Sequence, residues 1–196
     1  MKIFSTVFCA FIGTAIMGCG GLHVDRIALD DPRLPVDARQ WVADAEDAVV
    51  VSGARLAEAK TTVRDTVKRQ QETIASTPFT GAQGTPAQIK REQLGLARMD
   101  TAKAGLELAR AELALSKARL QLVYAETAMR HDIDVYNMPP LQAAVDSALQ
   151  AVVRWRGMHR KARSAELRAT DEWWTSWQSL VRVKGSDTRP FWSVSE

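Results

Sequence analysis

The chain is poor in the residues that build compact sites and globular cores. Its 196 residues include two cysteines, Cys9 and Cys19, and 11 glycines. Two thiols are too few for a four-cysteine metal centre. After residue 19 only two phenylalanines remain, Phe79 and Phe191. A globular core needs more large side chains than this, so a compact, aromatic-rich domain is not expected.

The chain also lacks the usual signatures of catalysis. It contains no glycine-rich phosphate loop, no Gly-x-Ser-x-Gly turn and no paired nucleophile and base. The one His/Asp cluster consists of His131, Asp132 and Asp134. It can be interpreted as ligands of a divalent ion, or as a solvated helix end with a histidine near the negative end of the helix dipole. We favour the helix end and expect no enzyme, no metal site and no cofactor.

The chain also lacks a large excess of either positive or negative charge. The formal net charge is +3. This balance gives no reason to expect nucleic acid as a partner.

The first residues read as an export signal. Lys2 precedes an apolar run over residues 3–17 that is shorter than the ~20 residues of a membrane span. A charged start, a short apolar run and small residues at its end are typical of a signal peptide. We therefore expect residues 1–18 to be cleaved, and Cys9 to leave with them.

The end of this signal, Ile16-Met17-Gly18-Cys19, resembles the lipobox of bacterial lipoproteins. Ile16 and Gly18 match the aliphatic and small positions of that motif, whereas Met17 is larger than usual. The resemblance implies that Cys19 becomes the first residue and carries fatty-acyl chains such as palmitate. It also implies that Gly20, which is not the aspartate of the inner-membrane retention signal, favours the outer membrane. One lipidated thiol would leave none for a disulfide.

The remaining sequence is dominated by alanine, with 29 residues in the chain. Alanine-rich, charge-rich segments are typical of long helices in close contact. In residues 86–130 a heptad pattern runs through five repeats, with mostly leucine at one position and alanine at the other. The first position holds Leu94, Thr101, Leu108, Leu115, Leu122 and Met129, and the second holds Ala97, Ala104, Ala111, Ala118 and Ala125. This pattern predicts a coiled-coil helix that begins at Pro86, after Thr85 as the N-cap residue.

The same helix carries a second apolar stripe on its other side. The stripe consists of Leu106, Ala109, Leu113, Ser116, Leu120 and Val123. A helix with two apolar faces has neighbours on both. The middle helix is therefore expected to lie between two others, or between one helix and a second protein.

Weaker helical patterns flank it, over residues 36–75 and from Pro139-Pro140 to about Val183. Short connections make neighbouring helices antiparallel. We thus predict an all-α fold, an elongated antiparallel three-helix bundle or coiled coil after a cleaved signal peptide. Residues 19–35 are interpreted as the linker from the lipid anchor, residues 36–184 as the bundle and residues 185–196 as a flexible tail.

Tryptophan is concentrated near the end of the chain, at Trp173, Trp174, Trp177 and Trp192. Trp173 and Trp177 share one helix face and Trp174 lies on another. The cluster can be a core cap that closes the end of the bundle. It can also be a docking surface, because tryptophan and arginine are enriched at binding hot spots.

Two classes of function follow. The first is a lipid-anchored structural or adaptor protein of the cell envelope that faces the periplasm and binds a macromolecular partner. The second is an envelope lipoprotein that binds a cell-wall glycan, a small molecule or a metal. A sizeable polar pocket would favour the second class. In both, the membrane is contacted through the lipid on Cys19, and an oligomer is possible.

Overall fold

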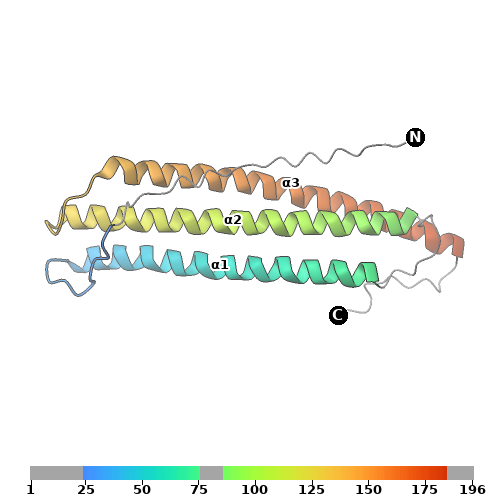
Figure 1. Cartoon of the computed structure of the whole chain (residues 1–196), viewed down its shortest axis with the longest axis horizontal. Helices are drawn as coiled ribbons and strands as arrows, with labels where there is room; N and C mark the ends of the chain where they lie inside the picture. Colours follow the sequence, from blue (N-terminus) through green and yellow to red (C-terminus); the bar gives the residue numbers. More distant parts are fainter. Residues whose placement is uncertain (1–23, 76–85, 185–196) are drawn as a thin grey trace, which may run out of the picture.

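Three long helices make up the computed structural model, which describes residues 24–75 and 86–184. They are α1 (Val36–Ala75), α2 (Pro86–Arg130) and α3 (Met138–Lys184). No strand occurs in these described ranges. The helices lie side by side along one long axis, and α3 extends past the start of α2 (Figure 1). The predicted elongated all-α fold is confirmed.

The middle position belongs to α2, which packs against both α1 and α3. Helices α1 and α3 run in the same direction and α2 runs against them (Figure 1). Within the described ranges, no Cα atom of α1 lies within 8 Å of a Cα atom of α3. The bundle is therefore open along one side, rather than closed into a triangle.

The leucine/alanine stripe of α2 faces α3. Ala111 and Leu115 are buried together with Val152 of α3, and Leu108 and Trp155 pack around them. Alanine on this seam lets the two backbones approach closely. Met129, the last member of the stripe, stays 40% exposed, one residue before α2 ends.

The second stripe of α2 faces α1, as the two-sided pattern predicts. Ser116 lies on this stripe, and its hydroxyl is 2.7 Å from that of Ser52 on α1. Leu120 and Val123 pack against the buried cluster that includes Val42 of α1. Both apolar faces of α2 are thus covered by a helix of the same chain.

Residues 24–35, the described part of the expected linker, pack against the end of the bundle. Val24, Ile27 and Leu34 are buried in one cluster with Tyr124 and Leu141. The Val24 amide also donates to the side-chain oxygen of Gln121, at 2.9 Å. This irregular segment therefore supplies part of the core between α1, α2 and α3.

The end of α2 has the geometry of a Schellman motif. Asp132 adopts a left-handed backbone with φ 52°. The amide of Ile133 donates to the carbonyl of Ala128 at 2.8 Å, and that of His131 to Thr127 at 3.1 Å. These bonds satisfy the last carbonyls of the helix. The interpretation of His131, Asp132 and Asp134 as a helix end agrees with this geometry.

Two features are absent from the described residues. They contain no group of three or more His, Cys, Asp or Glu side chains placed to hold a metal ion. They also contain no helix that is both long and apolar enough to cross a membrane.

Candidate docking groove and tryptophan cluster

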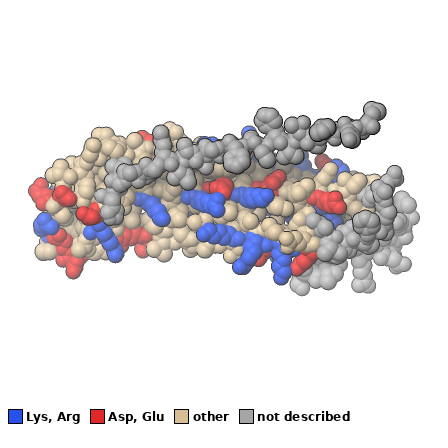
Figure 2. Space-filling model, in the orientation of Figure 1, with Lys and Arg blue, Asp and Glu red and all other residues tan. Residues whose placement is uncertain are grey.

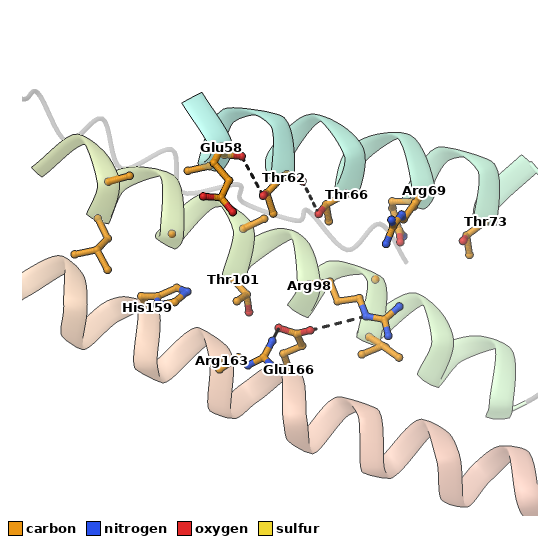
Figure 3. A pocket seen from close by; sticks show the side chains of 18 of the residues that line it. Glu58, Thr62, Thr66, Arg69, Thr73, Arg98, Thr101, His159, Arg163 and Glu166 are labelled. Carbon is orange, nitrogen blue, oxygen red and sulfur yellow. Dashed lines mark hydrogen bonds and ion pairs between the residues drawn. The ribbon is translucent and has the colours of Figure 1, made fainter. Parts of the chain in front are cut away.

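A groove opens between α1 and α3 in the half of the bundle away from residue 24. Its volume is about 1140 Å³. Its floor is α2, and its walls are the last part of α1 and the last part of α3 (Figure 3). It exists because α1 and α3 do not meet over α2.

The amino-acid pattern explains why they do not meet. In the first half of α1 the inward positions include the buried Ala38 and Val42. Further along, the positions of α1 that border the groove are polar, as at Thr62, Thr66 and Arg69 (Figure 3). Such side chains gain little by burial against another helix. The apolar contact that would close the bundle is thus missing at this end.

All three helices present a stripe to the groove with alternating spacings of four and three residues. On α1 the stripe is Arg55, Ala59, Thr62, Thr66, Arg69 and Thr73. On α2 it is Arg91, Gly95, Arg98, Ala102, Gly105, Ala109 and Glu112. On α3 it includes His159, Arg163, Glu166 and Trp173. This spacing is that of helices which face a common axis.

Arginines and glutamates form ion pairs across the groove. Glu166 of α3 lies 3.9 Å from Arg98 of α2 and 3.3 Å from Arg163 of its own helix. Glu112 lies 3.9 Å from Arg55 and 3.5 Å from Arg156. Each of these carboxylates is therefore shared by two guanidinium groups, which holds the arginine side chains over the groove.

Basic groups outnumber acidic ones in this part of the molecule. The groove lining contains five arginines, at positions 55, 69, 91, 98 and 163, and four glutamates, at 58, 72, 112 and 166. Arg156 and Lys68 pair with two of those glutamates from outside the lining. Figure 2 shows Lys and Arg side chains along the middle of one face with some Asp and Glu among them, and further Asp and Glu at the end where α1 begins.

Arg91 is the arginine with the clearest effect of burial. Burial lowers the pKa of its guanidinium, and the nearby Glu92 raises it by less. An arginine remains charged at neutral pH in spite of such a shift. A positive charge is thus held partly away from water in the lining of the groove.

Two glycines of α2 differ in how tightly the neighbouring helices cover them. A Cβ built at Gly95 would overlap the side chain of Gln70 from α1. A Cβ at Gly105 would only touch the His159 ring, with Nε2 at 3.6 Å. His159 of α3 thus lies over Gly105 on the groove side.

The tryptophans near the end of α3 form one stacked group that joins the groove. Trp173 is 4% exposed and lines the groove. Its ring stacks on Trp177 with centroids 6.3 Å apart and planes at 19°. Trp177 in turn stacks on Trp174 at 5.2 Å and 28°. Trp174 is 42% exposed.

Core cap and exposed surface therefore occur in the same cluster. Trp173 is buried, as the core-cap interpretation predicts, whereas Trp174 is 42% exposed, as the docking interpretation requires. Cys19 and Trp192, the two remaining predicted site residues, lie outside the described residues. Sequence reasoning missed the groove itself. The feature of the sequence that corresponds to the groove is a set of Thr and Arg residues after Ser52, spaced alternately by four and three. Such a set looks the same as a stripe that faces solvent.

No protein-family model, curated protein or solved structure matches this chain. The inferences about its function therefore rest on its own residues.

Proposed function

We propose that this protein is a lipid-anchored adaptor of the bacterial cell envelope that binds a macromolecular partner at the far end of its rod. Its lipid is attached to Cys19, its anchoring membrane is the outer membrane, and its helices face the periplasm. The sequence supports the anchor through Ile16, Gly18 and Cys19 at the end of the apolar leader.

The fold supports a separation between anchor and docking site. Cys19 precedes Val24 by five residues, which span at most ~18 Å when extended. Val24 packs with Ala38 and Val42 of the first turns of α1. Trp174 belongs to the last quarter of α3, and α3 ends at the opposite end of the rod from the start of α1 (Figure 1). At ~1.5 Å per residue, α1 alone covers about 60 Å of that distance.

The observation that carries the proposal is the exposed indole of Trp174 on top of a stacked cluster. Tryptophan is enriched among the residues that contribute most to binding at protein interfaces. Stacking on Trp177 holds the Trp174 indole in place, so little side-chain freedom is lost when a partner covers it.

Two experiments test the two halves of this proposal. For the anchor, mass spectrometry of the mature protein should find acyl chains on Cys19. Cys19→Ser should yield soluble protein or uncleaved precursor. An unmodified Cys19 at the mature terminus would refute the lipid anchor.

For the partner, crosslinking in the native envelope should give an adduct that Trp174→Ala loses while folding and lipidation persist. Val153→Ala, which also removes an exposed apolar side chain of α3, is the control. Equal adducts from both variants would refute the docking role of Trp174.

The second class of function, an envelope lipoprotein that binds a small ligand or glycan, is favoured by the groove. Its volume of about 1140 Å³ exceeds that of many ligand pockets, and its lining combines charged and hydroxyl side chains with apolar surface. Saturable binding of a neutral cell-wall oligosaccharide to the full chain would favour that class over the adaptor.

A further inference from the structure

We infer that the groove between α1 and α3 is the seat of a fourth helix, an acidic amphipathic helix supplied by the partner protein. This inference rests on the proposed partner-binding function and adds the chemistry of the partner. Three features of the groove support it: its helical spacing, its small floor and its excess of arginine.

The spacing comes first. The groove faces of α1, α2 and α3 all alternate four and three residues along one axis. A fourth helix with the same alternation can insert its side chains between theirs, as in four-helix bundles. An extended chain or a sugar polymer has no such repeat. The α2 floor runs from Arg91 to Glu112, which is about 30 Å of helix or roughly six turns.

The floor is suited to close approach of another backbone. Ala102, Gly105 and Ala109 lie on it at spacings of three and four residues. Trp173 also lines the groove, stacks on Trp177 and is joined through it to the exposed Trp174. Apolar side chains of a docked helix would therefore meet the floor and, beyond it, the indole of Trp174.

The walls determine the sign of the charge on that helix. Arg98 and Arg163 share the single carboxylate of Glu166. Arg55 and Arg156 share that of Glu112. One carboxylate cannot use all the N–H donors of two guanidinium groups. The remaining N–H groups can donate hydrogen bonds to a further carboxylate. A helix with glutamates at every three or four positions supplies such acceptors, whereas a basic helix would be repelled.

The test measures binding of synthetic helices to the full chain, purified in detergent with its lipid. The probe is a fluorescein-labelled peptide of about 20 residues, the length of the groove floor, with leucine and glutamate alternating on one face. A control peptide of the same length has glutamine in place of every glutamate. Fluorescence anisotropy reports binding, and salt should weaken it because the pairs are partly exposed.

The variants are chosen in pairs, so that loss of an arginine in the groove can be compared with loss of an arginine elsewhere on the surface. Arg98→Gln is compared with Arg110→Gln, because both arginines stand on α2, both pair with a glutamate, and their side chains are 50% and 53% exposed. Arg110 does not line the groove. Circular dichroism and thermal melting confirm that each variant is folded before its binding is measured.

The inference predicts the direction in which each change alters binding. The acidic helix binds and the glutamine helix binds at least several-fold more weakly. Arg98→Gln and Arg163→Gln each weaken binding about two- to five-fold, the range of single exposed ion pairs, and Arg110→Gln does not. Glu166→Gln strengthens binding about two- to five-fold, because it removes the internal carboxylate that competes for both guanidiniums.

Three results would overturn the inference: no binding of the acidic helix, equal loss from Arg98→Gln and Arg110→Gln, or a weaker complex with Glu166→Gln. Full displacement of the helix by tetragalacturonate, an acidic oligosaccharide, would also overturn it and assign the groove to a glycan. An envelope adduct that depends on Trp174 would survive any of these outcomes, so failure here is distinguishable from failure of the adaptor proposal.

Discussion

The hydroxyl groups of Ser52 on α1 and Ser116 on α2 lie 2.7 Å apart, between the two helices. Ser52 also donates to the carbonyl of Ala48, at 2.8 Å. Its hydroxyl hydrogen can serve only one of these acceptors at a time, so the Ser116 hydroxyl can donate to Ser52. The pair fixes the register of α1 on α2 just before the groove opens.

A double-mutant cycle tests this pair. Ser52→Ala should lower the free energy of unfolding by ~1 kcal/mol, because the Ser116 hydroxyl loses the Ser52 oxygen as its acceptor. Ser116→Ala should cost less, because the Ser52 hydroxyl still donates to the Ala48 carbonyl. The double variant should cost less than the sum of the two, since alanine suits the seam. Chemical denaturation measures all four proteins, and strictly additive effects would show that the hydroxyls do not interact.

The packing of α2 against α3 depends on small residues at the seam. Ala111 is 7% exposed and lies with Leu115 and Val152. Ala111→Trp should therefore destabilise the protein by at least ~1–3 kcal/mol through overpacking. Lys103→Trp, at an exposed position of the same helix, is the control. Denaturation midpoints that shift equally in both variants would contradict a close α2–α3 seam.

The tryptophan cluster should divide into a structural and an accessible member. Trp173→Ala should cost ~3–5 kcal/mol of stability, because it empties a buried aromatic site. Trp174→Ala should cost only ~1 kcal/mol, the approximate value of an aromatic contact. Thermal melts followed by circular dichroism measure the two. Similar losses would mean that Trp174 is as much a part of the core as Trp173.

Glu46 of α1 connects residue 26, in the segment before α1, with Tyr124 of α2. These contacts make the stability of the protein depend on pH in both the acidic and the alkaline range. Arg26 and Tyr124 both donate to its carboxylate. The hydrogen bond from Arg26, followed by that from Tyr124, lowers the pKa of Glu46. Its contribution is therefore present above the unfolded pKa of ~4.3 and is lost as the pH falls below that value.

At alkaline pH the sign is reversed. Burial, followed by the hydrogen bond to Glu46, raises the pKa of Tyr124 to about 12. Its contribution is complete below the unfolded pKa of ~10 and is lost as the pH rises from there to about 12. Unfolding measured across pH should show this alkaline loss in the wild type and a smaller one in Tyr124→Phe. An unchanged alkaline profile in that variant would contradict the assignment.

The sequence predicted the helices well because their local signals agree. Pro86 marks the start of α2, and five heptads of leucine and alanine define the face that meets α3. The opposite stripe correctly indicated a second neighbour. Helix periodicity likewise separated Trp173 and Trp177 from Trp174, and the burial of Trp173 and exposure of Trp174 follow that division.

The open groove could not be predicted in the same way. Thr62, Thr66 and Arg69 of α1 read as a solvent-facing stripe, and only the position of α3 shows that they border a groove. The docking of residues 24–35 was missed because an irregular segment has no periodicity. Val24 and Tyr124 are far apart in sequence, and only the tertiary structure brings them into one buried cluster.

Photo-crosslinking in living cells tests most directly whether the far end of α3 docks a partner. Benzoylphenylalanine at position 174 keeps an aromatic side chain at the exposed site, and the same residue at position 153 is the control, since Val153 is 63% exposed on the same helix. Docking at the tryptophan cluster predicts an adduct of one defined mass from position 174 and none from position 153. No adduct from position 174, or the same adducts from both positions, would contradict it.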